Sequence, residues 1–210
     1  MTTFRTDGAP PAWCELEHFE LIDLGLGETA ERTPSTAKER LIGTAGTTQL
    51  RQAGRSLLLK EAQFLDIDPA GGPWTLSGAT EGAAIVRLCG HWGDDLAGCG
   101  VFRVRPATGP ETKGDPVSYR KNTAIDSHYH DCDEYWIVLS GDGEVVVGAT
   151  HERLGPGDCL CIGMGHHHDF AWTDNEVKAV FFETTLEGRK RIGHLWNHTH
   201  GQAAPRAERV

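Results

Sequence analysis

The sequence lacks the features that mark nucleic-acid-binding, membrane and exported proteins. Its 210 residues carry 20 Lys and Arg against 30 Asp and Glu, which gives a formal net charge of −10 at pH 7. An acidic chain is repelled by nucleic-acid phosphates and by anionic lipid. No apolar run approaches the length of a membrane span, and residues 1–8 lack the apolar stretch of a signal peptide. We therefore expect a cytoplasmic protein with no nucleic-acid partner and no membrane partner.

The sequence also lacks a disulfide framework, a zinc ribbon and an internal repeat. Its six cysteines are expected to be reduced thiols, because no export signal accompanies them. Cys159 and Cys161 form C-x-C rather than C-x-x-C, and no second pair lies at zinc-ribbon spacing. Without a repeat, a chain of this length indicates one domain, with or without a sizeable extension.

Strand signals dominate the chain. Short segments rich in β-branched and aromatic residues, bounded by glycine, proline and polar turns, recur at 48–67, 83–88, 100–105, 135–139, 144–148 and 178–183. Many short strands with regular turn signals predict an all-β barrel or sandwich. Residues 35–42 are the exception, since they are typical of one or two helical turns, with Ser35 as a possible N-cap.

Metal-ligand side chains recur at regular spacing in residues 126–141. The pattern is H-x-H-x3-E-x6-G, formed by His128, His130, Glu134 and Gly141. Two histidines two apart on a strand point to the same face, and a polar turn after them would bring Glu134 back beside them. A second stretch, G-x5-G-x-G-x2-H, ends at His168 and offers a fourth ligand from another strand. Three imidazoles and one carboxylate predict a divalent-metal site.

Together the two stretches resemble the cupin superfamily. The first matches the cupin signature at its four key positions, whereas the second has Gly163 and Trp172 where proline and asparagine are usual. The resemblance spans roughly residues 98–183. It implies an all-β fold, the double-stranded β-helix or jelly-roll barrel, with extra N-terminal strands and a short C-terminal element. We accordingly expect an N-terminal extension at 1–97 whose strands add to the barrel, a cupin core at 98–183, and a C-terminal tail at 184–210 over the barrel mouth.

The four ligands leave one or two positions of an octahedral metal open, as a catalytic metal requires. Iron, manganese, nickel and zinc all accept such ligands, so the metal stays open. The function stays open as well, because cupins host many chemistries. The first hypothesis is a metal-dependent isomerase or lyase acting on a small polar metabolite, such as a sugar or an organic acid. The second is an iron-dependent dioxygenase, and the third is a non-catalytic cupin that binds a small molecule.

Two histidines beside the fourth ligand are candidates for catalysis. His166 and His167 precede His168, and either is suited to move a proton because histidine titrates near neutral pH. Strand alternation favours His166, whereas a slip of one residue at Gly165 would favour His167. The alternative is that one faces solvent and the other bonds the loop.

Further residues are candidates for substrate binding. Trp136 shares a face with Glu134, so it either packs in the core or walls a pocket. Arg103 and Arg105 would bind a carboxylate or phosphate if they point inward, and otherwise face solvent. His194 or His198 would reach the pocket if the tail forms a flap, and otherwise the tail is a polar turn. The apolar face opposite Trp136 needs a cover, from N-terminal strands or a second subunit, and we expect a homodimer.

Overall fold

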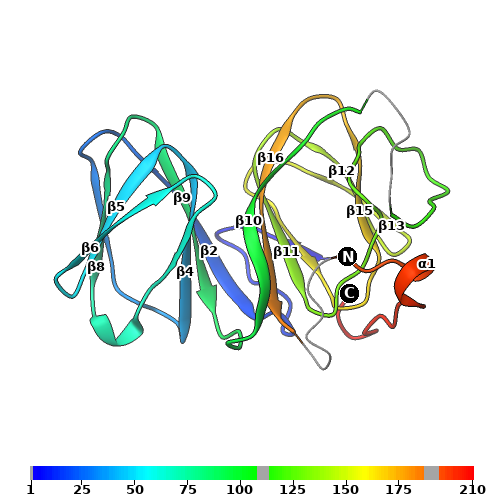
Figure 1. Ribbon diagram of the computed structural model, residues 1–210, viewed down its shortest axis with the longest axis horizontal. Coiled ribbons are helices and arrows are strands. Elements are labelled where there is room, and N and C mark those ends of the chain that lie inside the picture. The colour runs from blue at the N-terminus through cyan, green and yellow to red at the C-terminus, as the bar shows by residue number, and fades with distance from the viewer. Residues whose placement is uncertain (1, 108–113, 187–193) are drawn as a thin grey trace. The chain divides into compact units, whose positions relative to one another are not determined.

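The computed structural model describes residues 2–107, 114–186 and 194–210 (Figure 1). Within these residues the elements are the strands β1 to β16, one 3-10 turn (Pro69–Gly71) and one short helix, α1 (Asn197–His200). The strands pair antiparallel, which confirms the all-β prediction. No helix in the described ranges is long and apolar enough to cross a membrane.

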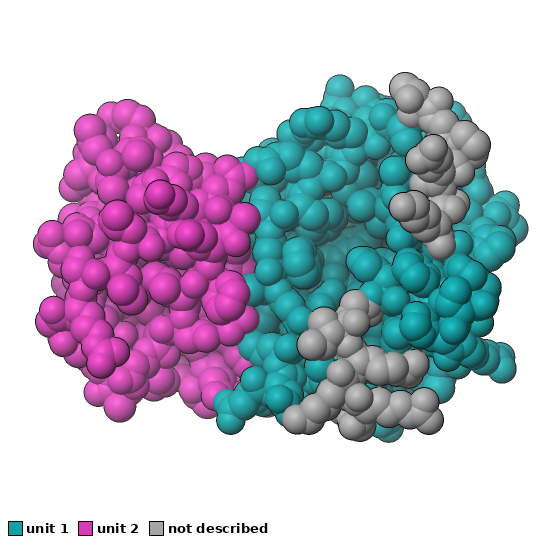
Figure 2. All heavy atoms as spheres, viewed as in Figure 1, with its two compact units in different colours: residues 1–5, 10–14, 93–210 teal, residues 6–9, 15–92 magenta. Residues whose placement is uncertain are grey.

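The chain folds as two compact units, drawn in separate colours in Figure 2. Unit 1 comprises Met1–Arg5, Pro10–Cys14 and Gly93–Val210, and unit 2 comprises Thr6–Ala9 and Glu15–Trp92. The expected cupin core at 98–183 lies within unit 1.

Unit 1 contains two antiparallel sheets. The larger sheet has the order β1-β14-β11-β16-β10 and the smaller has the order β13-β12-β15. The bounds of these strands are Thr2–Phe4 (β1), Leu96–Val104 (β10), Glu134–Ser140 (β11), Gly143–Val147 (β12), Thr150–Leu154 (β13), Cys159–Ile162 (β14), His168–Thr173 (β15) and Val177–Thr185 (β16). Apolar side chains from both sheets form one buried cluster, which includes Trp136, Val145, Leu160, Phe170 and Val177. The sheets therefore enclose a common interior, as in a jelly-roll barrel.

Unit 2 contains two further sheets of four strands each, in the orders β2-β9-β4-β7 and β3-β8-β5-β6. The bounds are Leu16–Leu24 (β2), Thr29–Arg32 (β3), Lys38–Ala45 (β4), Thr47–Gln52 (β5), Arg55–Lys60 (β6), Phe64–Asp66 (β7), Trp74–Gly78 (β8) and Ala83–Gly90 (β9). This unit has a core of its own, built around Leu41, Leu50, Trp74, Leu76 and Ile85.

The N-terminal strands differ from the expectation that they add to the barrel. Only β1, which pairs with β14, joins a barrel sheet, whereas the described strands β2 to β9 pair among themselves. The physical reason is that these strands have enough apolar residues to bury a face against each other, because both sheets contribute to the core around Trp74.

The prediction of a helical turn at 35–42 is also wrong. Residues Lys38–Ala45 form β4, which pairs with both β9 and β7. Ser35 does not cap a helix, because its hydroxyl and backbone N–H both donate to the Glu39 carboxylate (3.2 and 2.6 Å). Pairing on both sides and burial of six consecutive residues override the local helical pattern.

Candidate metal centre

The four predicted ligands come from three neighbouring segments of the barrel. His128 pairs with His168 at the start of β15, where each backbone N–H donates to the other's carbonyl (3.2 and 2.8 Å). Glu134 opens β11, after the bend that follows His130. The prediction that a turn brings Glu134 back beside His128 and His130 is therefore confirmed.

The side chains converge on one point. The ligand atoms of His128, His130, Glu134 and His168 all lie within 4.8 Å of one another, and all four residues are buried. The two Nε2 atoms of His128 and His130 are 3.0 Å apart. Oε2 of Glu134 lies 3.2 Å from Nε2 of His130 and 2.8 Å from Nε2 of His168.

Backbone carbonyls fix which nitrogen of each ring faces the centre. Nδ1 of His128 donates to the carbonyl of Asp126 (2.7 Å), and Nδ1 of His168 donates to the carbonyl of His166 (3.0 Å). With the proton on Nδ1, the lone pair of Nε2 points at the centre. Trp136 Nε1 donates to Oε1 of Glu134 (2.7 Å), so that Oε2 is the carboxylate atom that faces the rings.

Two of these buried atoms have no hydrogen-bond partner. Oε2 of Glu134 and Nε2 of His168 face each other as two acceptors, an arrangement that is repulsive unless a cation lies between them. The residues present therefore fit a divalent metal, with three imidazole nitrogens and one carboxylate oxygen as ligands.

The charges of the side chains agree with this fit. Burial, together with His168 and His130, moves the pKa of His128 far below its ordinary value. Burial alone would raise the pKa of Glu134, but His130 and His168 bring it well below its ordinary value. Neutral imidazole and ionised carboxylate are the forms that bind a metal.

A cavity of about 180 Å³ adjoins the cluster. Its wall includes two ionisable residues outside the ligand set, Glu183 of β16 and His194 of the tail. Oε1 of Glu183 lies 3.6 Å from Nε2 of His130, and the rings of His194 and His128 have centroids 4.0 Å apart. Burial and Glu134 raise the pKa of Glu183 to about 7, whereas His130 acts in the opposite direction.

Glu183 was missed by the sequence analysis. It pairs directly with Glu134 in the register of β11 and β16, but this register is not visible in the sequence. The available signal was a single acid at the end of the apolar run Ala179–Phe182. Trp136 belongs both to the buried cluster of the barrel and to the cavity wall, so both alternatives left open by the sequence are observed.

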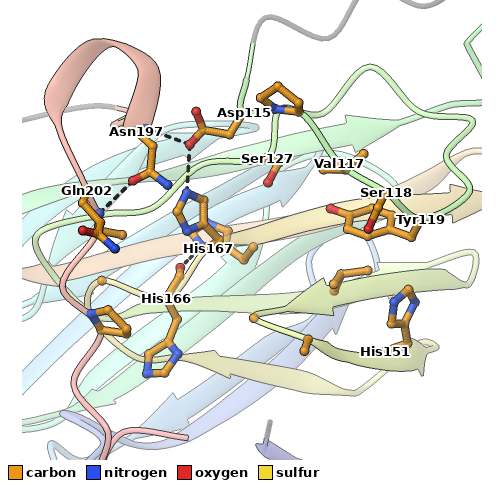
Figure 3. A pocket seen from close by; sticks show the side chains of 18 residues that line it. Asp115, Val117, Ser118, Tyr119, Ser127, His151, His166, His167, Asn197 and Gln202 are labelled. Atoms are coloured by element: carbon orange, nitrogen blue, oxygen red, sulfur yellow. Dashed lines mark hydrogen bonds and ion pairs between the residues drawn. The ribbon is translucent and has the colours of Figure 1, made fainter.

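His166 and His167 lie away from the cavity. They line a larger pocket of about 710 Å³, which Figure 3 shows from close by. Nε2 of His166 donates to the carbonyl of Arg206 (2.9 Å), and Nε2 of His167 bonds the Asp115 carboxylate (2.8 Å). Because β15 begins only at His168, strand alternation does not extend to His166. The geometry thus gives neither histidine the proposed proton transfer at the metal, and both bond the loop and tail segments, which is close to the alternative that the sequence left open.

Arg103 and Arg105 point away from the cavity as well. Arg103 follows Phe102 in β10 and Arg105 comes directly after the strand, whereas Phe102 lines the cavity. Their guanidinium groups pair with Glu176, and their side chains are 40% and 70% exposed. The outward orientation, one of the two left open by the sequence, is the observed one.

The described part of the C-terminal tail, residues 194–210, lies along the barrel (Figure 1, red), and the ring of its His194 contacts that of His128. Residues 187–193 of the expected tail lie outside the described residues. Leu195 and Tyr129 exchange two backbone hydrogen bonds (3.0 and 3.1 Å), which sets His194 over His128. Arg209 donates to both oxygens of the buried Asp133 (3.0 Å each). A Cβ on Gly163 would lie 2.1 Å from the carbonyl oxygen of Arg209, so the departure from the usual proline leaves room for the tail.

Comparisons with known sequences agree with this geometry. A family model described as "Cupin domain" matches residues 117–185. The uncharacterized protein y4oW of Sinorhizobium fredii (strain NBRC 101917 / NGR234) is 50% identical over 213 residues, which cover 100% of this chain and 97% of that protein.

Solved structures of low identity share the fold. A conserved protein of unknown function from Pseudomonas aeruginosa PAO1 is 12% identical, with a TM-score of 0.55 over 85% of this chain and 87% of that one. An IolB-like protein from Salmonella typhimurium LT2 is 13% identical, with a TM-score of 0.52 over 87% and 88%. A mutant of Bacillus subtilis oxalate decarboxylase is 11% identical, with a TM-score of 0.51 over 89% and 78%. With its jelly-roll barrel, its two motifs and its matching family model, the chain belongs to the cupin superfamily.

Proposed function

We propose that this cupin is a divalent-metal-dependent enzyme of lyase or isomerase type that acts on a small metabolite. The observation that carries the proposal is the pair of buried acceptors, Oε2 of Glu134 and Nε2 of His168, 2.8 Å apart beside a cavity. A bound divalent metal supplies a Lewis acid, which polarises a carbonyl or hydroxyl oxygen of the substrate.

The protein side chains supply the rest of the chemistry. His128, His130, His168 and Glu134 hold the metal, while Phe102 and Trp136 exclude water from one side of the cavity. Glu183 faces the cavity without belonging to the ligand set, so its carboxyl is placed to take a proton from a bound substrate or to return one. His194, on the tail, covers His128 and limits how far a ligand extends.

The test begins with the metal. The chain is purified without chelators, and its metal content is measured by elemental analysis for the wild type and for His130→Ala. We expect close to one transition metal per wild-type chain and a sharp loss in the variant, which stays folded. The matched control is His151→Ala, in which an exposed histidine of the same unit is removed. Stoichiometric metal in His130→Ala would contradict the ligand assignment.

The reaction class is tested with the loaded protein. Small carbonyl and hydroxy compounds are screened by NMR for substrate consumption, with Glu183→Gln as the variant expected to keep its metal and lose turnover. Dissolved oxygen is recorded in parallel. Oxygen uptake that depends on substrate and iron would replace the proposal by the dioxygenase alternative. Stoichiometric binding of a small molecule without turnover across the screen would favour the non-catalytic cupin.

A further inference from the structure

The cavity beside the metal cluster has a polar end and an apolar body. At the polar end lie His128, Glu134, Glu183 and His194. The body is formed by Phe102, Ile125, Trp136 and Phe181. The ring of Phe102 lies 5.5 Å from that of Trp136 and 6.2 Å from that of Phe181, measured between centroids, so the three rings form one continuous wall. A ligand that reaches the metal through this cavity therefore lays its body against these rings.

Hydrogen-bond donors are scarce in this wall. No arginine or lysine is among the described residues that line the cavity. The indole N–H of Trp136 is engaged with Glu134. The nearby cations are committed elsewhere, since Arg103 and Arg105 pair with Glu176 and Lys121 pairs with Asp169. A hydroxyl or carboxylate on the body of a ligand would lose its water and gain little in return.

The volume limits the ligand further. An apolar cavity of about 150 Å³ is enough for benzene, so about 180 Å³ holds a head group and a body of that size or less. Phe181 fixes one boundary, because its ring packs over Gly100 of β10. A Cβ on Gly100 would lie 2.9 Å from Cε1 of Phe181. The ring therefore uses the room that this glycine leaves.

We propose that the ligand of this site has one oxygen-bearing head, which reaches the metal, and a compact apolar body without hydroxyl or carboxylate groups. The inference rests on the proposed function, because it takes the metal as the anchor of the head. It narrows the substrate class away from sugars and dicarboxylic acids. Short-chain or single-ring carbonyl, enol and monocarboxylic compounds fit the class.

Hydroxamates test this inference because they share a metal-binding head and differ only in the body. Zn²⁺-loaded protein is titrated by calorimetry with two pairs of matched shape. Isovalerohydroxamate is compared with malonomonohydroxamate, and propionohydroxamate with glycolohydroxamate. We expect the apolar member to bind more tightly in each pair, by on the order of tenfold or more in the first pair and severalfold in the second. Equal or tighter binding of the polar members would overturn the inference.

The outcomes separate this inference from the proposed function. If the protein holds no metal and no hydroxamate binds, the metal centre itself is wrong. If all four bind without preference for the apolar body, the centre stands and the inference falls.

A designed reversal sharpens the test. Phe181→Arg places a hydrogen-bond donor in the wall. It should change the ratio of the two dissociation constants in the first pair by on the order of tenfold, in favour of malonomonohydroxamate. Leu58→Arg adds the same charge at an exposed leucine of unit 2 and should leave the ratio unchanged. If Phe181→Arg does not fold, the wild-type ratios still decide.

Discussion

Each unit buries a cluster of ionisable side chains, and the two clusters differ in whether their polar atoms have protein partners. In unit 2, Arg87 is 3% exposed and binds Glu39 through two nitrogens (3.1 and 2.7 Å), while a third contact joins it to Glu20 (2.7 Å). The Cζ atom of Arg87 lies 5.2 Å from the ring centroid of Trp74. Every charge in this network has a protein partner, and none of its members lines a cavity described above. We interpret it as structural.

In unit 1 the metal cluster is left incomplete, although other buried carboxylates of the unit, such as Asp133 and Asp169, have charged partners. Oε2 of Glu134 and Nε2 of His168 have no hydrogen bond, and they adjoin a cavity. A protein tolerates unsatisfied buried groups where a ligand completes them. The comparison teaches that burial does not separate a structural network from a functional one. What separates them is whether each buried polar atom has a hydrogen-bond or ion-pair partner.

The largest effect is expected from breaking the complete network. Arg87→Met leaves the carboxylate of Glu39 buried without its cation, and the free energy of unfolding should fall by about 3–5 kcal/mol. Chemical denaturation measures this loss. Arg32→Met is the matched control, because Arg32 pairs with the same Glu20 (2.8 Å) in a partly exposed site. It should cost less than about 1 kcal/mol. Similar losses in the two variants would show that burial does not strengthen this network.

The incomplete cluster should respond to metal rather than to a protein partner. Without metal, the charge of Glu134 is stabilised by His130 and His168 rather than by an arginine. Glu134→Gln should therefore lower the free energy of unfolding by less than Arg87→Met does. At a free metal concentration of 100 times Kd, the wild type should gain about 2.7 kcal/mol. His130→Ala should lose most of this gain. Unfolding curves recorded with metal and with a chelator provide the measurement, and a large loss for Glu134→Gln in chelator would contradict the comparison.

The attachment of the tail comes next in size. Arg209→Ala removes the cation that bonds Asp133, although Asp133 still accepts from the N–H of Met164 (2.8 Å). Because a buried carboxylate loses a charged partner, we expect a cost of about 1–3 kcal/mol in unfolding free energy. Release of the tail should also weaken hydroxamate binding to the loaded protein, since His194 walls the cavity. Unchanged hydroxamate affinity would mean that the tail stays in place without Arg209.

The sequence predicts the ligands of the site well because their spacing is local. Residues 128–134 need only one bend to converge, and the second motif adds His168 at a fixed offset. The surroundings need the tertiary structure. Glu183 faces Glu134 through the pairing of β11 with β16, and this register is set by packing along the two strands.

Orientation was the other weak point of the sequence. Alternation offered two faces for Arg103 and Arg105, and only the packing of Phe102 against Trp136 decides between them. The same rule was wrong for His166, because that residue precedes β15, which begins at His168. In unit 2, the pairing of β4 with two neighbours replaced an expected helix. Local patterns thus predict chemistry more reliably than they predict the direction of a side chain.

The smallest predicted effect concerns a satisfied carboxylate in unit 1 that lies outside the metal cluster. Burial raises the pKa of Asp115, but the side chain of His198, the N–H of Asn197 and the side chain of His167 together lower it to about 2, from an ordinary value of 3.8. A carboxyl whose pKa is lowered by folding stabilises the folded state above its unfolded pKa, and this contribution disappears as the pH falls toward the folded pKa.

The stability conferred by Asp115 should therefore be complete above about pH 5 and decline between pH 4 and pH 2. Since His198 is partly exposed, we expect a contribution of about 1 kcal/mol. The measurement is the difference in unfolding free energy between the wild type and Asp115→Asn, followed with pH in chelator so that metal release does not contribute. A difference that stays constant from pH 6 to pH 3 would show that the contacts of Asp115 do not depend on its charge. Asp115 would then stabilise the fold as uncharged core residues do, and unlike the ion-paired network of unit 2.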